Sequence, residues 1–132
     1  MTTAAAVEVR SPSYQAFQIL HIAFTVAPIA AGADKFFHIL ANWDIYCAPA
    51  IPHMIGLSVH TFMSIVGVVE IVAGLVVAIA PRIGAWVVAA WLCGIIVNLL
   101  MIGSFFDIAL RDFGLALGAV ALARLSAEYS DR

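Results

Sequence analysis

Polar and ionisable side chains stand inside the long apolar stretches of this sequence, where they are best placed to do chemistry. The residues concerned are Glu70, Trp91, Asn98, Arg111 and Asp112. A charged side chain in hydrocarbon costs about 2.5–3.5 kcal/mol on insertion scales, so such groups pair with one another or serve a function. A carboxyl group can transfer a proton, and asparagine, arginine and tryptophan can donate hydrogen bonds beside it. These five residues form a candidate buried polar site, of a kind that could hold a quinone.

A second polar group is expected where two apolar stretches reach the same side of a membrane. Asp34, Lys35 and His38 close the first stretch, and His60 opens the second. Two histidines at similar depth on adjacent helices would suit a haem iron or a copper ion. Their spacing matches no metal-site motif, however, and interface histidines commonly cap helix ends. We therefore predict an outer-interface cluster without a metal; haem and copper are disfavoured, and His38 and His60 are the candidate ligands if a metal binds.

The composition places most of the chain in lipid. Of its 132 residues 64% are hydrophobic and only 11% are charged, whereas a soluble domain carries about 25% charged residues. So little polar surface cannot cover a water-soluble protein. The net charge of −2, without a basic cluster, excludes nucleic acid as a partner. Cys47 is expected in a loop and Cys93 within a helix, which excludes a disulfide framework.

Four apolar stretches are each long enough to cross about 30 Å of hydrocarbon at 1.5 Å per residue. They run over residues 14–40, 59–80, 84–103 and 106–125. Prolines interrupt the first connection, and residues 81–84 and 103–107 are predicted as turns. The fold class is therefore all-α: one transmembrane domain, residues 14–125, forms an antiparallel four-helix bundle between a polar tail at 1–13 and a C-terminal tail at 126–132.

Basic residues set the orientation of this bundle. Arg10, Arg82, Arg124 and Arg132 fall on one side of the predicted spans, whereas Lys35 and Arg111 lie toward the other. Because cytoplasmic loops are richer in lysine and arginine, both termini are predicted in the cytoplasm. We expect the first span to be retained and not cleaved as a signal peptide, and the protein to lie in a bacterial cytoplasmic (inner) membrane.

Residues spaced by three, four or seven share one face of a helix, and three such faces are predicted to point inward. They are His60, Met63, Gly67, Glu70, Gly74 and Val77; Trp91, Gly94 and Asn98; and Arg111, Gly114 and Gly118. Glycines beside charges indicate helices packed closely around a polar centre. In one interpretation Glu70 pairs with Arg111 and Asn98 in a structural network, since buried ions must be paired whatever the function. In the other these residues form a proton or ligand site, and the spacing leaves both open.

Three segments resemble DoxX-like membrane proteins. Residues 31–38, Ala-Gly-Ala-Asp-Lys-Phe-Phe-His, followed by Asn42-Trp43, resemble the exit motif of that family's first helix. Residues 67–74 resemble its glycine-flanked glutamate, and the pair Arg111-Asp112 fits the start of its last helix. The resemblance covers residues 16–125 and implies a four-helix fold associated with membrane redox chemistry; relatives include a small subunit of thiosulfate:quinone oxidoreductase.

The positions carried over by the resemblance are Asp34, Lys35, His38, Glu70, Arg111 and Asp112, without catalytic roles. No pair of thiols of the kind used in disulfide exchange is present, which argues against direct thiol chemistry. The leading hypothesis is a small subunit or accessory protein of a membrane oxidoreductase that contributes to a quinone site. The alternatives are a proton-coupled transporter working as a homo-oligomer and a purely structural subunit of a larger membrane complex. Expected partners are the lipid bilayer and other membrane subunits or further copies of this chain; whether the chain is itself an enzyme stays open.

Overall fold

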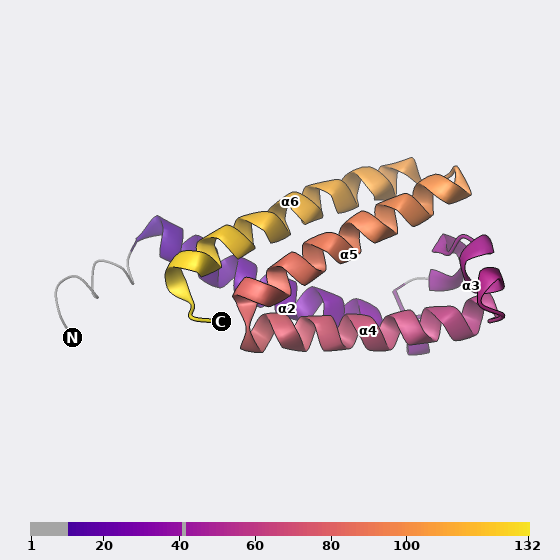
Figure 1. The fold of residues 1–132 in the computed structure, drawn as a ribbon, viewed down its shortest axis with the longest axis horizontal. Helices are drawn as coiled ribbons and strands as arrows, with labels where there is room; N and C mark the ends of the chain where they lie inside the picture. Colours follow the sequence, from indigo (N-terminus) through magenta and orange to yellow (C-terminus); the bar gives the residue numbers. More distant parts are fainter. Residues whose placement is uncertain (1–10, 41) are drawn as a thin grey trace.

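The computed structural model describes residues 11–40 and 42–132, and these form an all-α structure (Figure 1). The long helices are α2 (Pro12–Phe37), α4 (Val59–Ile79), α5 (Pro81–Ile102) and α6 (Phe106–Tyr129). A 3-10 turn, η1 (Trp43–Tyr46), and a short helix, α3 (Ala50–Met54), lie in the connection between α2 and α4. The predicted all-α fold with antiparallel long helices is confirmed.

Local capping explains where these helices begin. The side chains of Ser11 and Ser58 accept hydrogen bonds from the backbone N–H of Tyr14 and Thr61, each at 3.2 Å, and so satisfy an orphan donor at the start of α2 and α4. Proline suits the first helical position because it has no N–H to leave unpaired. For this reason the predicted turn over residues 81–84 is wrong: α5 begins at Pro81, one residue after the end of α4.

Two other predicted boundaries shift for reasons of hydrogen bonding. The first helix ends at Phe37 and not at Leu40, because the Asp34 carboxylate captures the N–H groups of Ile39 and Leu40, which a continuing helix would use. The last helix continues four residues beyond the predicted span, to Tyr129, where its tyrosine ring packs on α2.

The long helices form two pairs. α2 packs along α4, and α5 packs along α6, with fewer contacts between the pairs. From their junction at Ala80, α4 and α5 diverge, and η1 and α3 lie at the open end (Figure 1). At the closed end the apolar core joins all four helices through residues such as Phe24, Val77, Ala85 and Leu122. The predicted polar site must therefore lie toward the open end.

Glycines bring α2 and α4 together. A Cβ atom added at Gly67 would lie 2.7 Å from the carbonyl oxygen of Gly32, and one added at Gly74 would lie 2.8 Å from that of Thr25. These distances are too short for any side chain, so the two backbones touch as in other small-residue helix contacts. The predicted inward stripe of α4 is confirmed, since Met63, Gly67, Glu70, Gly74 and Val77 are buried; His60, at its end, is exposed.

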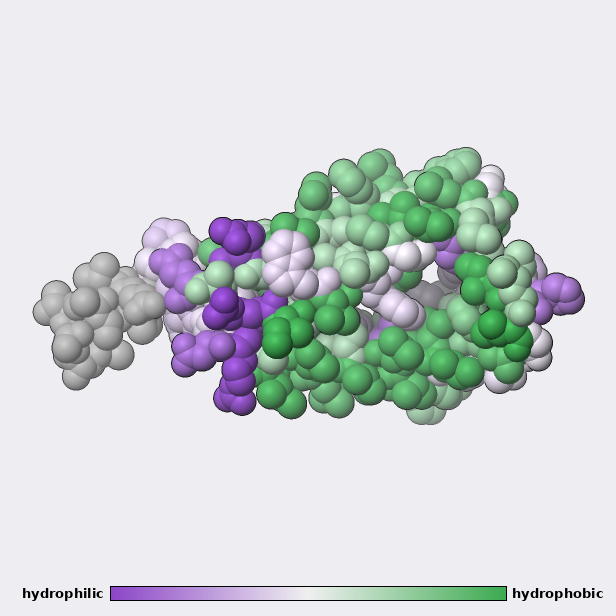
Figure 2. All heavy atoms as spheres, in the orientation of Figure 1, coloured by the Kyte–Doolittle hydropathy of each residue, from purple (hydrophilic) through white to green (hydrophobic). Residues whose placement is uncertain are grey.

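The outer surface of the helices is apolar. Figure 2 shows hydrophobic side chains over the length of the bundle, with hydrophilic ones gathered mainly at the end where the C-terminus lies and few at the opposite end. By length and composition α2, α4 and α5 could each cross a membrane. α6 has a comparable length of 24 residues but carries Asp107, Arg111 and Asp112 in its first two turns. Three of the four predicted spans are thus supported by composition.

Both ends of the described chain lie at the closed end of the bundle, which we call the terminal end; the opposite end, with η1 and α3, is the loop end. The rings of Tyr14 and Tyr129 are 5.2 Å apart, and the Arg82 N–H donates to the Arg132 carbonyl oxygen at 2.8 Å. Arg82, Arg124 and Arg132 therefore share the terminal end, as predicted. Arg10 lies outside the described residues.

Candidate functional site

A buried ion pair joins α2 to α4. The ammonium group of Lys35 contacts Oε1 of Glu70, and the two side chains are only 4% and 10% exposed. Each charged residue follows a glycine of the α2–α4 contact by one turn, so the close approach of Gly32 and Gly67 brings Lys35 and Glu70 within reach. Both charges are removed from solvent and compensate each other.

An indole ring covers this pair. The Lys35 ammonium lies 4.1 Å from the centroid of the Trp43 ring, a cation–π distance, and also approaches the Ala31 carbonyl oxygen at 3.5 Å. Trp43 belongs to η1, so the connection between α2 and α4 folds back over the ion pair. The site therefore consists of a charged pair contributed by two helices and an aromatic ring, contributed by the loop, that covers it.

The predicted pairing of Glu70 with Arg111 and Asn98 is wrong. Glu70 pairs with Lys35 because α4 packs along α2, whereas the Arg111 side chain is 63% exposed and donates to its neighbour Asp112 at 3.2 Å. Asn98 binds the loop instead. Three of the residues predicted to form one site thus bind different partners.

The predicted inward faces of α5 and α6 also need correction. Gly94, Arg111 and Gly114 are exposed, and a Cβ atom added at either glycine would meet nothing within 4 Å. Of the two glycines predicted on the inward face of α6, only Gly118 faces another helix: a Cβ atom added there would lie 3.2 Å from the Phe24 ring. The inward face of α6 consists of small residues, one leucine and one carboxylate, namely Ala109, Asp112, Ala116, Ala119, Leu122, Ala123 and Ser126. These alanines take the packing role predicted for the glycines.

Asp112 is a second buried carboxylate. It is 4% exposed and lies on the inward face of α6. Trp91 of α5 has a buried indole N–H without a hydrogen-bond partner among the described residues.

Glu70 and Trp91 lie at a similar depth in the bundle. They are about ten residues to either side of Ala80, so both are about 15 Å from the junction of α4 and α5. Figure 2 shows the surface hollowed toward the loop end between the two helix pairs, with hydrophilic side chains inside the hollow.

Asp34 holds the start of the loop over the site. Its carboxylate accepts hydrogen bonds from the N–H groups of Ile39 and Leu40, at 2.8 and 2.9 Å, and from the Trp43 indole N–H at 2.8 Å. Asp34 is itself buried. This carboxylate orients the indole ring that covers Lys35, so it is a positioning residue for the site.

Asn98 holds the next part of the loop from the other helix pair. Its side-chain oxygen accepts from the Ala48 N–H at 2.8 Å, and its amide donates to the Tyr46 carbonyl oxygen. The Tyr46 ring meets the Phe105 ring edge-on at a centroid distance of 4.8 Å.

Cys47 lies between the two residues, Tyr46 and Ala48, that Asn98 binds. Burial raises the pKa of the Cys47 thiol, and the negative charge of Asp44 raises it further. Cys47 is therefore held as a neutral thiol.

The predicted outer-interface cluster divides into two layers. Asp34 and Lys35 point into the bundle, as described above, whereas the rings of His38 and His60 stack outside it with centroids 5.8 Å apart. The His60 ring nitrogen Nδ1 lies 3.1 Å from Asp44 Oδ2. Sequence spacing did not single out Asp44 or the role of Trp43, because both belong to a loop whose path depends on Asp34 and Asn98.

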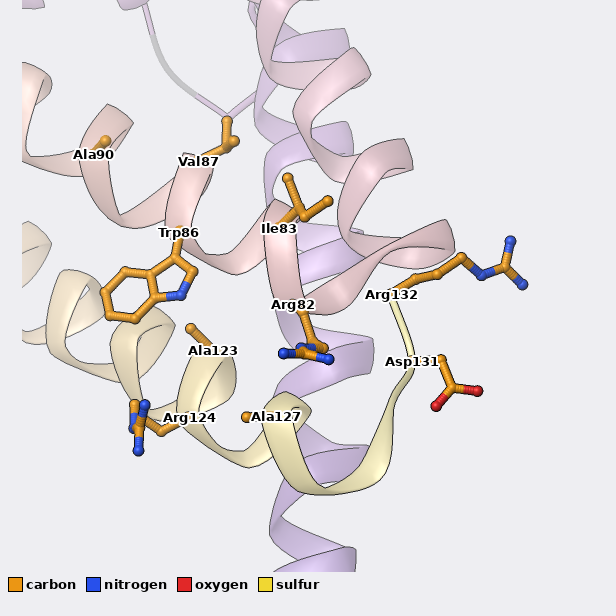
Figure 3. Close-up of a pocket in the computed structure, with 10 residues that line it drawn as sticks. All are labelled: Arg82, Ile83, Trp86, Val87, Ala90, Ala123, Arg124, Ala127, Asp131 and Arg132. Carbon is orange, nitrogen blue, oxygen red and sulfur yellow. The ribbon is translucent and has the colours of Figure 1, made fainter.

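A groove lies at the terminal end, away from the ion pair. It has a volume of about 700 Å³ between α5 and α6 and is lined by Arg82, Trp86, Arg124 and Arg132 among others (Figure 3). The Arg82 side chain points from α5 toward α6, beside Ala127. Cations and a tryptophan at the end of apolar helices are typical of a membrane–water boundary. This groove contributes no carboxylate or histidine to the buried site.

Comparison with protein families, with curated proteins and with solved structures finds no match for this chain. The resemblance to DoxX-like proteins remains a prediction from the sequence. The function must be inferred from the buried site itself.

Proposed function

We propose that this chain is a small four-span subunit of a membrane oxidoreductase, of the DoxX-like kind, and that its Lys35–Glu70 pair forms one wall of a quinone site. The observation that carries the proposal is a pair of opposite charges held at 4% and 10% exposure between apolar helices, with an indole ring over the lysine. Intramembrane ionisable groups of this kind mark proton relays and ligand sites.

The chemistry of a quinone suits these groups. Reduction to the quinol takes two electrons, which the partner subunit supplies, and two protons, one for each carbonyl oxygen. Lys35 can donate a hydrogen bond to a carbonyl oxygen of the quinone. Glu70 can take up a proton from Lys35 or from water and pass it to that oxygen. Asp112 offers a second buried carboxylate, and Trp91 offers an unused indole N–H. Trp43 supplies an aromatic wall for the ring.

The path of α6 supports a fourth span. This helix has 24 residues and returns the chain to the terminal end, where Tyr129 packs against Tyr14. The charged side chains in its first turns lie at the loop end, near a membrane surface. Because the arginines gather at the terminal end, both termini lie on the cytoplasmic side of a bacterial inner membrane.

Quinone binding is tested by tryptophan fluorescence of the full chain in lipid nanodiscs, titrated with a short-chain ubiquinone. The chain has three tryptophans, and Trp86 at the terminal end serves as the matched control for Trp43 and Trp91. We expect saturable quenching that survives Trp86→Phe, weakens in Trp43→Phe and is lost in Glu70→Gln. Quenching that rises linearly and equally in all variants would mean that the quinone only dissolves in the lipid, and the quinone site would be rejected.

The subunit assignment is tested by gentle extraction of the tagged protein from its own membrane. We expect a redox-active membrane complex to co-purify, with quinone-dependent activity that falls at least about 100-fold in Glu70→Gln, by the usual size of a general acid–base contribution. Glu128→Gln, an exposed glutamate at the terminal end, is the control. Recovery of the chain alone as a homo-oligomer, with substrate uptake that requires Glu70 and a proton gradient, would favour the transporter instead. Full activity after joint replacement of Lys35 by Met and Glu70 by Leu would leave only a structural role.

A further inference from the structure

Three metal-ligating side chains from three different segments converge at the loop end. His38 follows the last residue of α2, Asp44 belongs to η1, and His60 lies in the first turn of α4. One donor atom from each of these residues lies within 4.8 Å of the other two. This group, which we call the His-Asp-His cluster, lies outside the buried Lys35–Glu70 pair and takes no part in the function proposed above.

The backbone holds His38 in place for this contact. It adopts a left-handed conformation, with φ at +54°, and its N–H donates to the Asp34 carbonyl oxygen at 2.6 Å. A residue other than glycine rarely adopts this conformation, although histidine does so more readily than most. The turn sets the His38 ring parallel to the His60 ring, at an interplanar angle of 26°. Asp44 then reaches His60 from η1, at 3.1 Å.

Two polar atoms of the cluster have no partner within the described part of the chain. Nδ1 of His38 and Oδ1 of Asp44 are both buried, and neither makes a hydrogen bond. Buried polar atoms of native proteins nearly always have a partner. A ring nitrogen and a carboxylate oxygen are thus left unpaired in two residues that adjoin a second histidine. This arrangement indicates a ligand that accepts electron pairs.

We propose that the His-Asp-His cluster binds one divalent transition-metal ion of the Zn²⁺ class. Two imidazoles and one carboxylate form a three-ligand set that such ions use with a further position left for water. Ca²⁺ and Mg²⁺ are poor occupants because they prefer oxygen ligands throughout. Ligands that share a tetrahedral Zn²⁺ lie about 3.3 Å apart, since each bond is about 2.0 Å long. The cluster reaches this spacing by side-chain rotation, for which His60, with 65% of its side chain exposed, has room.

The bound ion would fasten the loop over the buried site. It would link the end of α2, η1 and the start of α4, and η1 carries the Trp43 ring that covers Lys35. The metal would therefore stabilise the closed position of the loop without touching the ion pair.

The test is Zn²⁺ binding by the full chain in nanodiscs, after removal of any histidine tag, by calorimetry and by metal analysis after dialysis. We expect about one Zn²⁺ per chain and a higher thermal unfolding midpoint with the ion, because the metal binds only the folded cluster. His38→Ala, His60→Ala and Asp44→Asn should each weaken binding at least about tenfold. His53→Ala is the matched control, since His53 is exposed in the same connection but lies outside the cluster, and it should bind as the wild type does.

Asp44→Asn is the decisive variant, because it keeps the shape of the side chain and removes only the charge. Its folding is checked by an unchanged helical circular dichroism spectrum. No Zn²⁺ bound by the wild type, or binding that Asp44→Asn and the double variant His38→Ala/His60→Ala retain, would overturn the proposal. An equal loss in His53→Ala would do the same, because it would place the ion elsewhere in the loop.

Discussion

Lys35 and Glu70 illustrate how one buried contact constrains two residues together. Taking both charges out of water costs several kcal/mol for each ion, and their mutual attraction offsets this only while both are present. The contact needs the Lys35 side chain to turn inward below Trp43, where the aromatic ring adds a favourable cation–π interaction. Removal of either side chain alone would leave the other as an unpaired buried charge.

The ion pair predicts a non-additive effect on stability. Lys35→Met or Glu70→Leu alone should lower the free energy of unfolding by about 3–5 kcal/mol, because each leaves an uncompensated buried charge, whereas the double variant should lie close to the wild type. Denaturant unfolding in detergent, analysed as a double-mutant cycle, measures this. Arg124→Met and Glu128→Leu, four residues apart on the exposed face of α6, form the control cycle and should couple by no more than about 0.5 kcal/mol. Additive losses at Lys35 and Glu70 would contradict the pairing.

Cys47 reports on whether the loop is closed. Burial and the charge of Asp44 raise the pKa of its thiol, so the folded protein favours the protonated form. The resulting stability is present below the unfolded pKa, about 8.5, and is lost as the pH rises through the higher folded value. We predict slow reaction of Cys47 with a thiol reagent at pH 7, with a rate that increases at alkaline pH. Because Cys93 is exposed, the reaction is followed in Cys93→Ala, and a rapid reaction of this variant at pH 7 would show that the loop does not cover Cys47.

At the scale of elements, the loop between α2 and α4 depends on a side chain from α5. Asn98→Ala removes the hydrogen bonds to the backbone on either side of Cys47. We predict that it accelerates Cys47 labelling at pH 7, because the loop opens more often, while the helices stay folded. Ser64→Ala is the control, since among the described residues the Ser64 hydroxyl donates only within α4, to the His60 carbonyl oxygen, and it should leave the labelling rate unchanged. Equal labelling rates in the two variants would mean that Asn98 does not hold the loop.

The α2–α4 contact predicts opposite effects of alanine at two glycines. Gly67→Ala places its methyl group 2.7 Å from the Gly32 carbonyl oxygen, and overpacking of this kind costs about 1–3 kcal/mol. It should also loosen the Lys35–Glu70 pair. Gly94→Ala meets nothing within 4 Å, so the higher helix propensity of alanine should stabilise the protein by up to about 1 kcal/mol. Thermal unfolding in detergent separates the two, and a neutral Gly67→Ala would show that the helices can move apart without cost.

At the scale of the whole molecule, the structure places the two ends of the described chain, from residue 11 to residue 132, together and the loop at the far end. Four crossings require Met54 and Asp131 to lie on opposite sides of the membrane. In a variant without the native cysteines, Met54→Cys should react with an impermeant thiol reagent on intact cells, and Asp131→Cys only after permeabilisation. Both positions are exposed in the structure. Labelling of both from outside would mean that α6 does not cross, and the reverse pattern would invert the orientation.

Much of the helical architecture could be read from the sequence. Apolar runs predict the long helices because hydrophobicity and backbone hydrogen bonding within a helix are local properties. The buried stripe of α4 was predictable for the same reason, since Gly67, Glu70 and Gly74 recur with the helical period. The helix start at Pro81 was missed, although the preference of proline for the first helical position was a usable signal.

The packing partners were decided only by the tertiary structure. A helix that is apolar on every side carries little periodic signal for its inward face, so Gly94 and Gly114 were placed inward although they are exposed. Glu70 could have paired with Arg111 or with Lys35 on charge alone, and the glycine contact between α2 and α4 selects Lys35. The sequence predicted His38 and His60 at a similar depth, whereas Asp44 joins them only through the path of the loop. Periodicity along one helix specifies which residues are buried together, whereas contacts between elements depend on how close their backbones can approach.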